Sequence, residues 1–251
     1  ATSVNESGYN YVGWNWLAGG NQGSSNTDGS INTTYTSVNT TSGISISLYT
    51  GTGSNATVGH GLGVAPKMIL VKESTGSVND WTVYHATQGN TTRGILNETN
   101  AWGSNTAWNN TTPTSSFFYI GSGSNTNRSG STYMAYCFAE KTGYSKFGSY
   151  VGNGNSDGPF NYCGFKPAFV MAKKASDTGG WQLRDNKRTP AGNLTNNLLY
   201  ANASSAEQTT DGVDFLSNGW KLKNSAGDSN ASGATYIFMA FGQTLVGTNN
   251  I

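Results

Sequence analysis

The segment GTGSNATVGHGLGVAPKMILVK, residues 51–72, returns in altered form as GNGNSDGPFNYCGFKPAFVMAK at residues 152–173. Each copy has a glycine-rich turn, then a proline, then a continuous apolar run. Short apolar runs led by proline are typical of strands that are covered on both faces of a sheet. The alignment places Gly53 on Gly154, Gly63 on Gly164, Pro66 on Pro167 and Lys72 on Lys173. The pair therefore predicts two copies of one β unit.

The similarity continues to the end of each copy. Trp81 falls on Trp181, and STYMAYCFAE (131–140) matches ATYIFMAFGQ (234–243). We therefore expect three parts: an N-terminal strand and polar linker at 1–29, a first β-sandwich repeat at 30–142 and a second at 143–251.

The local patterns indicate β structure throughout. GISISLYTG (43–51) alternates apolar and polar residues with the period of a half-buried strand. DFLSNGWKLK (214–223) carries Asn218-Gly219, a pair that favours a two-residue hairpin with positive φ at both turn positions. No segment has a helical pattern of useful length. The predicted fold is all-β, with two tandem homologous antiparallel β-sandwich (jelly-roll-like) domains and an extra N-terminal strand.

The N-terminal segment GYNYVGWNWLAGG (8–20) repeats the aromatic rhythm of the closing strands. It resembles the last strand of a missing copy, and three interpretations stay open. It ends a preceding repeat, it lies along the sheet of the first repeat, or it is an assembly strand that pairs with the edge of a neighbouring subunit. Under the last interpretation Tyr9, Tyr11, Trp14 and Trp16 carry the contact.

The composition limits the classes of partner. Charged residues make up 11% of the 251 residues and the net charge is +1, so the chain lacks the basic surface of a nucleic-acid-binding protein. No apolar stretch approaches the roughly 18 residues that a membrane helix needs. We expect neither nucleic-acid nor membrane partners. A polar surface with little charge favours an extracellular location, and Ala1 favours a processed or trimmed chain.

The pattern of reactive residues predicts a protein that is not an enzyme. His60 and His85 are the only histidines, and the second copy keeps neither. The carboxylates are dispersed and form no repeated pair, which disfavours a polysaccharide hydrolase. We expect no catalytic residues, no metal site and no cofactor.

Two sequence features suggest binding or cross-linking. Trp102 and Trp108, with Asn109, lie in an asparagine-rich loop that could stack a sugar ring, although these tryptophans could equally fill the first sandwich. Cys137 and Cys163 could form one disulfide in an oxidising compartment, or stay as buried free thiols.

Asn-x-Ser/Thr sequons are frequent, as expected when Asn, Ser and Thr are abundant. In a host that glycosylates asparagine they would carry sugar; otherwise they are a by-product of composition. The candidate acceptors are Asn32, Asn39, Asn55, Asn90, Asn97, Asn110, Asn127, Asn193, Asn202 and Asn230.

The motifs TGTGSNATVGHGLGVAPKMILVK and AYCFAEKTGYSKFGSY resemble a β domain of undefined activity from structural proteins of marine tailed phages and cyanophages. The resemblance covers nearly all of residues 30–247. It implies a fibre, appendage or decoration protein of a virion, and it transfers no site residues. The second copy lacks the GHGLG turn, so any role of that turn is confined to the first copy.

The first functional hypothesis is a non-enzymatic structural protein of a virion or extracellular assembly. Strand edges and aromatic patches would serve assembly or host attachment, with other copies of the chain or other virion proteins as partners. The alternative is a lectin-like adhesin that binds glycans of a host surface.

Overall fold

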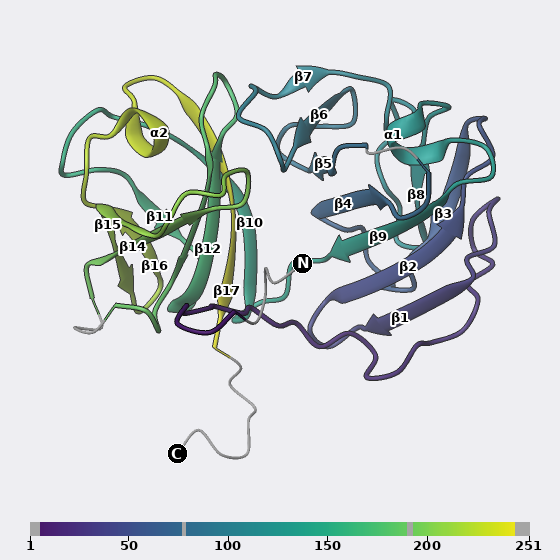
Figure 1. The fold of residues 1–251 in the computed structure, drawn as a ribbon, viewed down its shortest axis with the longest axis horizontal. Helices are drawn as coiled ribbons and strands as arrows, with labels where there is room; N and C mark the ends of the chain where they lie inside the picture. Colours follow the sequence, from purple (N-terminus) through teal and green to yellow (C-terminus); the bar gives the residue numbers. More distant parts are fainter. Residues whose placement is uncertain (1–5, 77–78, 190–192, 244–251) are drawn as a thin grey trace.

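A computed structural model describes residues 6–76, 79–189 and 193–243. These residues form antiparallel β-sheets and two helices of four residues each, which confirms the all-β class. Figure 1 shows two halves side by side. We call residues 30–142 the first half and residues 143–243 the second half.

The first half is built on a seven-stranded sheet with the order β1-β2-β9-β4-β5-β6-β7, and β3 pairs separately with β8. The continuous apolar run at residues 68–71 lies in the central strand β4, as its sequence predicts. The bounds are β1 Tyr35–Asn39, β2 Ile44–Thr50, β3 Ala56–Gly59, β4 Met68–Glu73, β5 Thr82–His85, β6 Thr92–Ile95, β7 Gly103–Ser104, β8 Phe117–Ile120, α1 Ser124–Asn127 and β9 Thr132–Phe138.

The second half is an eight-stranded sheet with the order β10-β17-β12-β13-β14-β15-β16-β11. The order β2-β9-β4-β5-β6 of the first half recurs here as β10-β17-β12-β13-β14, so the repetition seen in the sequence is also present in the topology. The bounds are β10 Ser145–Val151, β11 Phe160–Tyr162, β12 Pro167–Lys174, β13 Trp181–Asp185, β14 Thr195–Tyr200, β15 Gln208–Leu216, β16 Gly219–Leu222, α2 Gly227–Asn230 and β17 Thr235–Gly242.

A buried clamp of two tyrosines and one asparagine fixes the turn after β2. Tyr49 stacks on Tyr133 with ring centroids 5.3 Å apart. The Tyr49 hydroxyl donates to the Thr126 carbonyl of α1 at 2.6 Å. The Asn127 side chain accepts from the Thr52 backbone N–H at 2.7 Å and donates to the Gly121 carbonyl at 3.0 Å. Each group therefore satisfies a backbone partner that burial would otherwise leave unpaired.

The second half repeats this clamp. Tyr150 stacks on Tyr236 at 4.8 Å and donates to the Ser229 carbonyl at 2.8 Å. Asn230 accepts from the Asn153 backbone N–H at 2.8 Å and donates to the Asn224 carbonyl at 2.7 Å. The two clamps have similar geometry. This explains why the sequence is similar in the two copies at the segments that form them.

The glycine that opens each quoted segment is required by close packing on this clamp. A Cβ on Gly51 would lie 2.3 Å from the Arg128 carbonyl oxygen, and one on Gly152 would lie 2.2 Å from that of Ala231. Both distances are shorter than real Cβ contacts, and backbone oxygens cannot move aside cheaply. Any larger residue would therefore displace the α1 or α2 turn.

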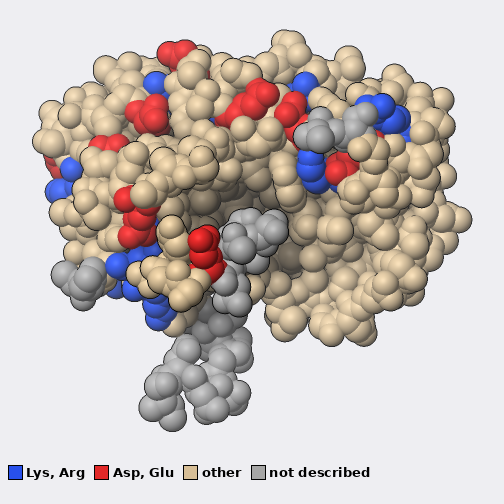
Figure 2. Space-filling model, in the orientation of Figure 1, with Lys and Arg blue, Asp and Glu red and all other residues tan. Residues whose placement is uncertain are grey.

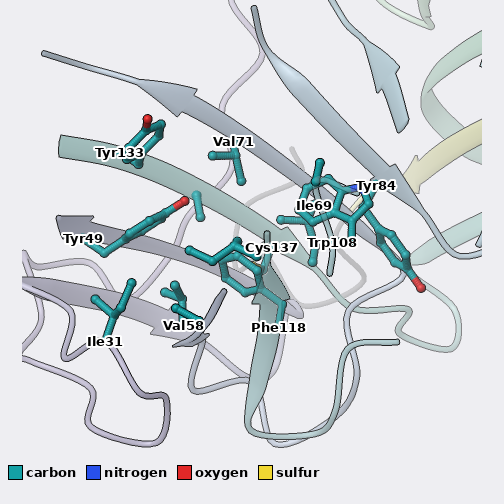
Figure 3. Close-up of a cluster of buried hydrophobic side chains, with 14 of the residues drawn as sticks. Ile31, Tyr49, Val58, Ile69, Val71, Tyr84, Trp108, Phe118, Tyr133 and Cys137 are labelled. Atoms are coloured by element: carbon teal, nitrogen blue, oxygen red, sulfur yellow. The ribbon is translucent and has the colours of Figure 1, made fainter. Parts of the chain in front are cut away.

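The interior of the first half is apolar and aromatic (Figure 3). Tyr84 and Trp108 pack edge to face, with ring centroids 5.6 Å apart, and Trp108 is 1% exposed. Ser45 and Ser47 of β2 face this interior, while Ile46 and Leu48 are only half-buried on the opposite face. The alternation predicted for β2 is thus present, with the serines on the more deeply buried side.

Two local expectations need correction. β15 and β16 do form a hairpin, but Leu216 pairs with Gly219, so Ser217 and Asn218 make the turn and neither Asn218 nor Gly219 has positive φ. The N-terminal residues 9–17 form no strand: among the described residues the first strand begins at Tyr35. Trp14 and Trp16 pack against the rest of the molecule through their side chains, which requires no ladder of backbone hydrogen bonds.

Candidate functional site: the seam between the halves

A third hydrophobic cluster lies between the two halves, and we call it the seam. It joins residues from β2, β4, β5 and β9 to residues from β10, β12, β13 and β17. Burial of each such side chain contributes about 1.5–3 kcal/mol. The seam therefore joins the halves as strongly as a domain core does. Its buried members are Ile44, Met68, Val83, Phe138, Phe147, Phe169, Met171, Ala175, Trp181, Ile237, Met239 and Phe241.

Polar contacts also cross the seam and fix how the halves are oriented. They run from His85 Nε2 to the Phe238 carbonyl (3.2 Å), from Trp181 Nε1 to the Ile95 carbonyl (2.8 Å), from Trp102 N to the Ala175 carbonyl (2.8 Å) and from Gly179 N to the Thr99 carbonyl (2.9 Å). Lys173, 1% exposed, adds a bond from Nζ to the Thr99 carbonyl at 3.2 Å, and burial lowers its pKa to about 8. Directional bonds of this kind specify one arrangement of the halves.

His85 is fully buried at the seam and is neutral at physiological pH. Burial lowers its pKa to about 4, although the bond to the Phe238 carbonyl acts in the opposite direction. A carbonyl only accepts, so the proton lies on Nε2, and Nδ1 accepts from the Thr87 hydroxyl at 2.9 Å. His85 therefore acts as a structural bridge between the halves.

The N-terminal segment closes one end of the seam with two tryptophans. Trp16 packs edge to face on Phe138 of the first half and on Phe169 and Phe241 of the second, with ring centroids 5.3–6.5 Å apart. Trp14 packs on Phe169 at 5.4 Å. In Figure 1 this purple segment runs across the lower ends of β12 and β17. The segment is thus an integral part of the seam.

An ion pair holds Trp14 in place. Trp14 Nε1 donates to the Asp185 carboxylate at 3.1 Å, Arg188 Nε donates to the same carboxylate at 2.6 Å, and the guanidinium lies 5.5 Å from the Trp14 ring centroid. Burial alone would raise the pKa of Asp185, but the bonds from Arg188 and from the Lys187 backbone outweigh it and keep the pKa below its usual value. Asp185 therefore stays ionised at neutral pH.

A cleft of about 850 Å³ opens beside these tryptophans. Aromatic rings line its floor: Trp14, Trp16, Tyr144, Phe169 and Phe241. Its rim carries amides, hydroxyls and two lysines: Asn15, Asn39, Thr41, Ser42, Asn186, Gln243, Lys141 and Lys187. An apolar floor with a few convergent polar groups is the usual composition of a ligand site.

One rim group has no partner within the described part of the chain. The side-chain oxygen of Asn186 is buried and accepts no hydrogen bond there. Such an atom costs about 1–3 kcal/mol unless a ligand or solvent donor reaches it. Because this oxygen is buried, it lies behind the wall of the cleft and is not itself presented to a ligand.

The charges of the molecule are thinly spread. Figure 2 shows Lys, Arg, Asp and Glu in small separate groups on a mostly uncharged surface. Within residues 6–76, 79–189 and 193–243, no three His, Cys, Asp or Glu side chains gather into a metal-binding group. In the same ranges no helix is long and apolar enough to cross a membrane.

The tryptophan loop considered as a sugar-binding platform is not exposed as one surface. Trp108 is buried in the first-half core, as the alternative interpretation of the sequence predicted. Trp102 is half-buried against the seam, with its ring 5.9 Å from that of Trp181. Asn109 is half-buried in a turn with φ of 48°. These three residues do not form one exposed face.

Of the two alternatives left open for the cysteines, the structure has the buried free thiols. Cys137 lies in the first-half core and Cys163 in the second-half core, and both are free buried thiols. Burial raises the pKa of both thiols, to about 12 for Cys163, so both are protonated and inert at neutral pH.

Two of the ten sequons are wrong as candidates in the folded chain. Asn127 and Asn230 are 0% exposed, and their amides hold the clamps described above, so a glycan at either nitrogen would disrupt the fold. Five of the others, Asn32, Asn55, Asn97, Asn110 and Asn193, are exposed, while Asn39, Asn90 and Asn202 are half-buried.

The seam residues Tyr144, Phe169, Asp185 and Asn186 were not singled out from the sequence. The one available signal was the alignment of His85 with Asp185, which places polar residues at equivalent positions in both copies. Nothing local showed that the two copies would face each other there.

The fold and the cleft together define a class: a two-lobed all-β protein with an aromatic site where the lobes meet. A family model described as a domain of unknown function (DUF7483) matches residues 1–244, and the chain belongs to this family. The match spans the N-terminal segment and both halves. No curated protein and no solved structure matches the chain.

Proposed function

We propose that this protein is a non-enzymatic structural subunit of a virion or extracellular assembly. The single observation that carries the proposal is the two-sided character of residues 9–17. Trp14 and Trp16 anchor the segment in the seam, while Tyr9, Tyr11 and Leu17 are 66%, 52% and 68% exposed. Three large, exposed apolar side chains within one short anchored segment are a candidate interaction surface. Here a neighbouring copy of the chain would cover them.

We further propose that the halves are tandem homologous antiparallel β-sandwiches that arose by duplication, with boundaries at residues 30–142 and 143–251. The shared strand order, the paired clamps and the paired glycines support this. The resemblance to phage structural proteins supports the virion as the setting. Other virion proteins are then the alternative partners.

The proposal is tested by the state of association of the chain. At high concentration the native protein should form oligomers or filaments by light scattering and electron microscopy. The triple variant Tyr9→Ser, Tyr11→Ser, Leu17→Ser should remain folded and lose this association. A matched control, Tyr162→Ser, changes a tyrosine that is 64% exposed in the second half and should associate normally. Native protein that stays monomeric would contradict the proposal.

A second candidate function is glycan binding by a lectin-like adhesin, with the seam cleft as the site. The observation that favours it is the aromatic lining of the cleft, with Asn186 and other amide residues beside it. Sugar rings stack their apolar faces on aromatic rings and donate their hydroxyls to amide oxygens.

A glycan array followed by calorimetry would test this candidate. Asn186→Ala and Tyr144→Leu should each weaken binding of an identified glycan at least about tenfold, because a lost hydrogen bond or stacking contact is worth roughly 1–1.5 kcal/mol. Asn32→Ala, an exposed amide remote from the cleft lining, serves as the control. Silence on a broad array would remove this candidate and leave the assembly proposal standing.

A further inference from the structure

The first half covers the outer edge of β3 with residues that precede its first strand. We call residues 24–33 the strap. The Ile31 backbone N–H donates to the Thr57 carbonyl of β3 at 3.0 Å. Ser30 adds two bonds, from its backbone N–H to the Thr57 hydroxyl at 2.7 Å and from the Thr57 backbone N–H to its own hydroxyl at 2.9 Å. An extended segment therefore satisfies the outward polar groups of this edge.

The second half has an equivalent strand, β11. β3 pairs with β8, and β11 pairs with β16. Each partner strand supplies the aromatic ring that packs on the clamp tyrosine, Phe118 in the first half and Trp220 in the second. The residues opposite these rings are Val58 of β3 and Asn161 of β11. These two residues are therefore equivalent, and so are their neighbours along each strand.

The edge of β11 has no strap. Only residues 139–144 connect β9 to β10, and they form a turn. β11 is the last strand of the eight-stranded sheet. Phe160 and Tyr162 take the positions of Thr57 and Gly59. Thr57 is half-buried and Gly59 is buried, whereas Phe160 and Tyr162 are 43% and 64% exposed.

The backbone of β11 presents unused hydrogen-bonding groups at this edge. Along an antiparallel strand, successive residues direct their N–H and C=O groups alternately toward and away from the partner strand. The Pro159 carbonyl and the Cys163 N–H bond to the β16 side, at 3.1 and 2.9 Å. Phe160 and Tyr162 therefore direct theirs away from β16, and neither has a backbone hydrogen bond within the described part of the chain.

β11 lacks the usual chemical protection of an edge strand. Such strands are commonly protected by charged residues or by proline, and Phe160, Asn161 and Tyr162 are neither. Lys221, opposite Phe160, is engaged elsewhere: it donates to the Gly158 carbonyl at 2.6 Å and pairs with a carboxylate of the same loop. The strand offers two exposed rings on one face, and aromatic rings stabilise cross-strand pairs.

We propose that β11 is a docking edge that accepts an extended segment of a different protein. The segment hydrogen-bonds to the backbone of Phe160 and Tyr162 and lays apolar side chains on their rings, a mode of recognition that adds a strand to a sheet. The strap is the model for its chemistry: an aliphatic residue flanked by Ser, Thr and Asn.

The identity of the partner follows from how the strap is used. The strap of a second copy is already bound to its own β3, so the partner is another chain. The inference rests on the proposed assembly function only in taking that chain to be another subunit of the assembly. The surface is separate from residues 9–17.

A synthetic peptide of residues 24–33 is the probe, because this segment binds the equivalent edge of the first half. In an NMR titration of isotope-labelled native protein, millimolar peptide should shift the amide signals of Phe160 and Tyr162 and slow their hydrogen exchange. The absence of shifts would overturn the proposal. So would shifts confined to Thr57 and Gly59, which would show exchange with the strap alone.

Two variants at one position separate backbone pairing from ring contact. Tyr162→Pro removes an outward N–H that the folded chain does not use, which an edge strand tolerates, and it should abolish peptide binding. Tyr162→Ser keeps the N–H and loses the ring, so it should bind the peptide about threefold to tenfold more weakly. Equal affinity of native protein and Tyr162→Pro for the peptide would contradict the proposal.

The same titration on the triple variant Tyr9→Ser, Tyr11→Ser, Leu17→Ser distinguishes this inference from the assembly function. Peptide binding by native protein and by this variant, together with native protein that stays monomeric, would contradict the assembly function and support the docking edge. Native protein that associates but does not bind the peptide would overturn the docking edge alone. Loss of self-association in Tyr162→Ser would make a second copy the occupant and contradict the proposed partner.

Discussion

The two halves share their strand order and their tyrosine–asparagine clamps but not the content of their interiors. In the first half Tyr84 of β5 packs on Trp108 in an aromatic core, whereas in the second half Arg184 of β13 occupies the strand position that corresponds to Tyr84. The comparison separates two kinds of constraint. Glycine, tyrosine and asparagine at the turns specify the topology, while the interior face of β5 or β13 accepts different side chains.

The largest expected effect comes from making the first interior resemble the second. Tyr84→Arg places a charge in an aromatic core, where no residue corresponds to the Gln182 oxygen that accepts from Arg184, so it should cost at least about 5 kcal/mol or prevent folding. Tyr84→Phe, the matched control, should cost less than about 1.5 kcal/mol. Urea unfolding measures both. A stable Tyr84→Arg protein would show that the two interiors are equivalent after all.

A pH titration probes the seam that both halves share. The folded pKa of His85, about 4, lies below its unfolded value of 6.5, so the unfolded chain binds more protons between these values. Stability should fall by about 3 kcal/mol as pH drops from 6.5 to 4, with no further loss from this group below pH 4. His60, whose pKa is also lowered by burial, acts in the same direction. Denaturant midpoints across this pH range, compared with those of His85→Gln, provide the measurement. If the variant loses the same stability at acid pH, His85 does not contribute to the pH dependence.

The paired clamps allow a matched comparison between halves. Asn127→Ala and Asn230→Ala each leave buried backbone groups unpaired and should each cost about 2 kcal/mol. Asn32→Ala, exposed in the same chain, should change the free energy of unfolding by less than about 0.5 kcal/mol. Strongly unequal losses of unfolding free energy at Asn127 and Asn230 would mean that the two clamps contribute differently to stability.

The smallest effect concerns the N-terminal anchor. Trp14→Phe keeps an aromatic ring on Phe169 and removes the N–H that binds Asp185, so it should cost about 1 kcal/mol. Tyr11→Phe, which changes a 52% exposed ring, is the control and should be neutral. No difference between these two variants would show that the hydrogen bond adds nothing to the anchor.

Much of the architecture followed from sequence patterns because local rules act there. The apolar runs at residues 68–71 and 167–172 became central strands, and the internal repetition reappeared in the strand order. The cleft at the seam could not be predicted from the sequence, because it forms where two copies that are distant in the sequence meet. Residues 9–17 carry a strand-like aromatic pattern, yet the partners of Trp14 and Trp16 are side chains at residues 138–241, which no local rule relates to them.

The central claim is that the seam makes the two halves and the N-terminal segment one body. Differential scanning calorimetry of the full chain tests this most directly, because independent domains unfold separately. We predict a single transition whose calorimetric and van't Hoff enthalpies agree. Two transitions, or a van't Hoff enthalpy near half of the calorimetric one, would contradict the claim.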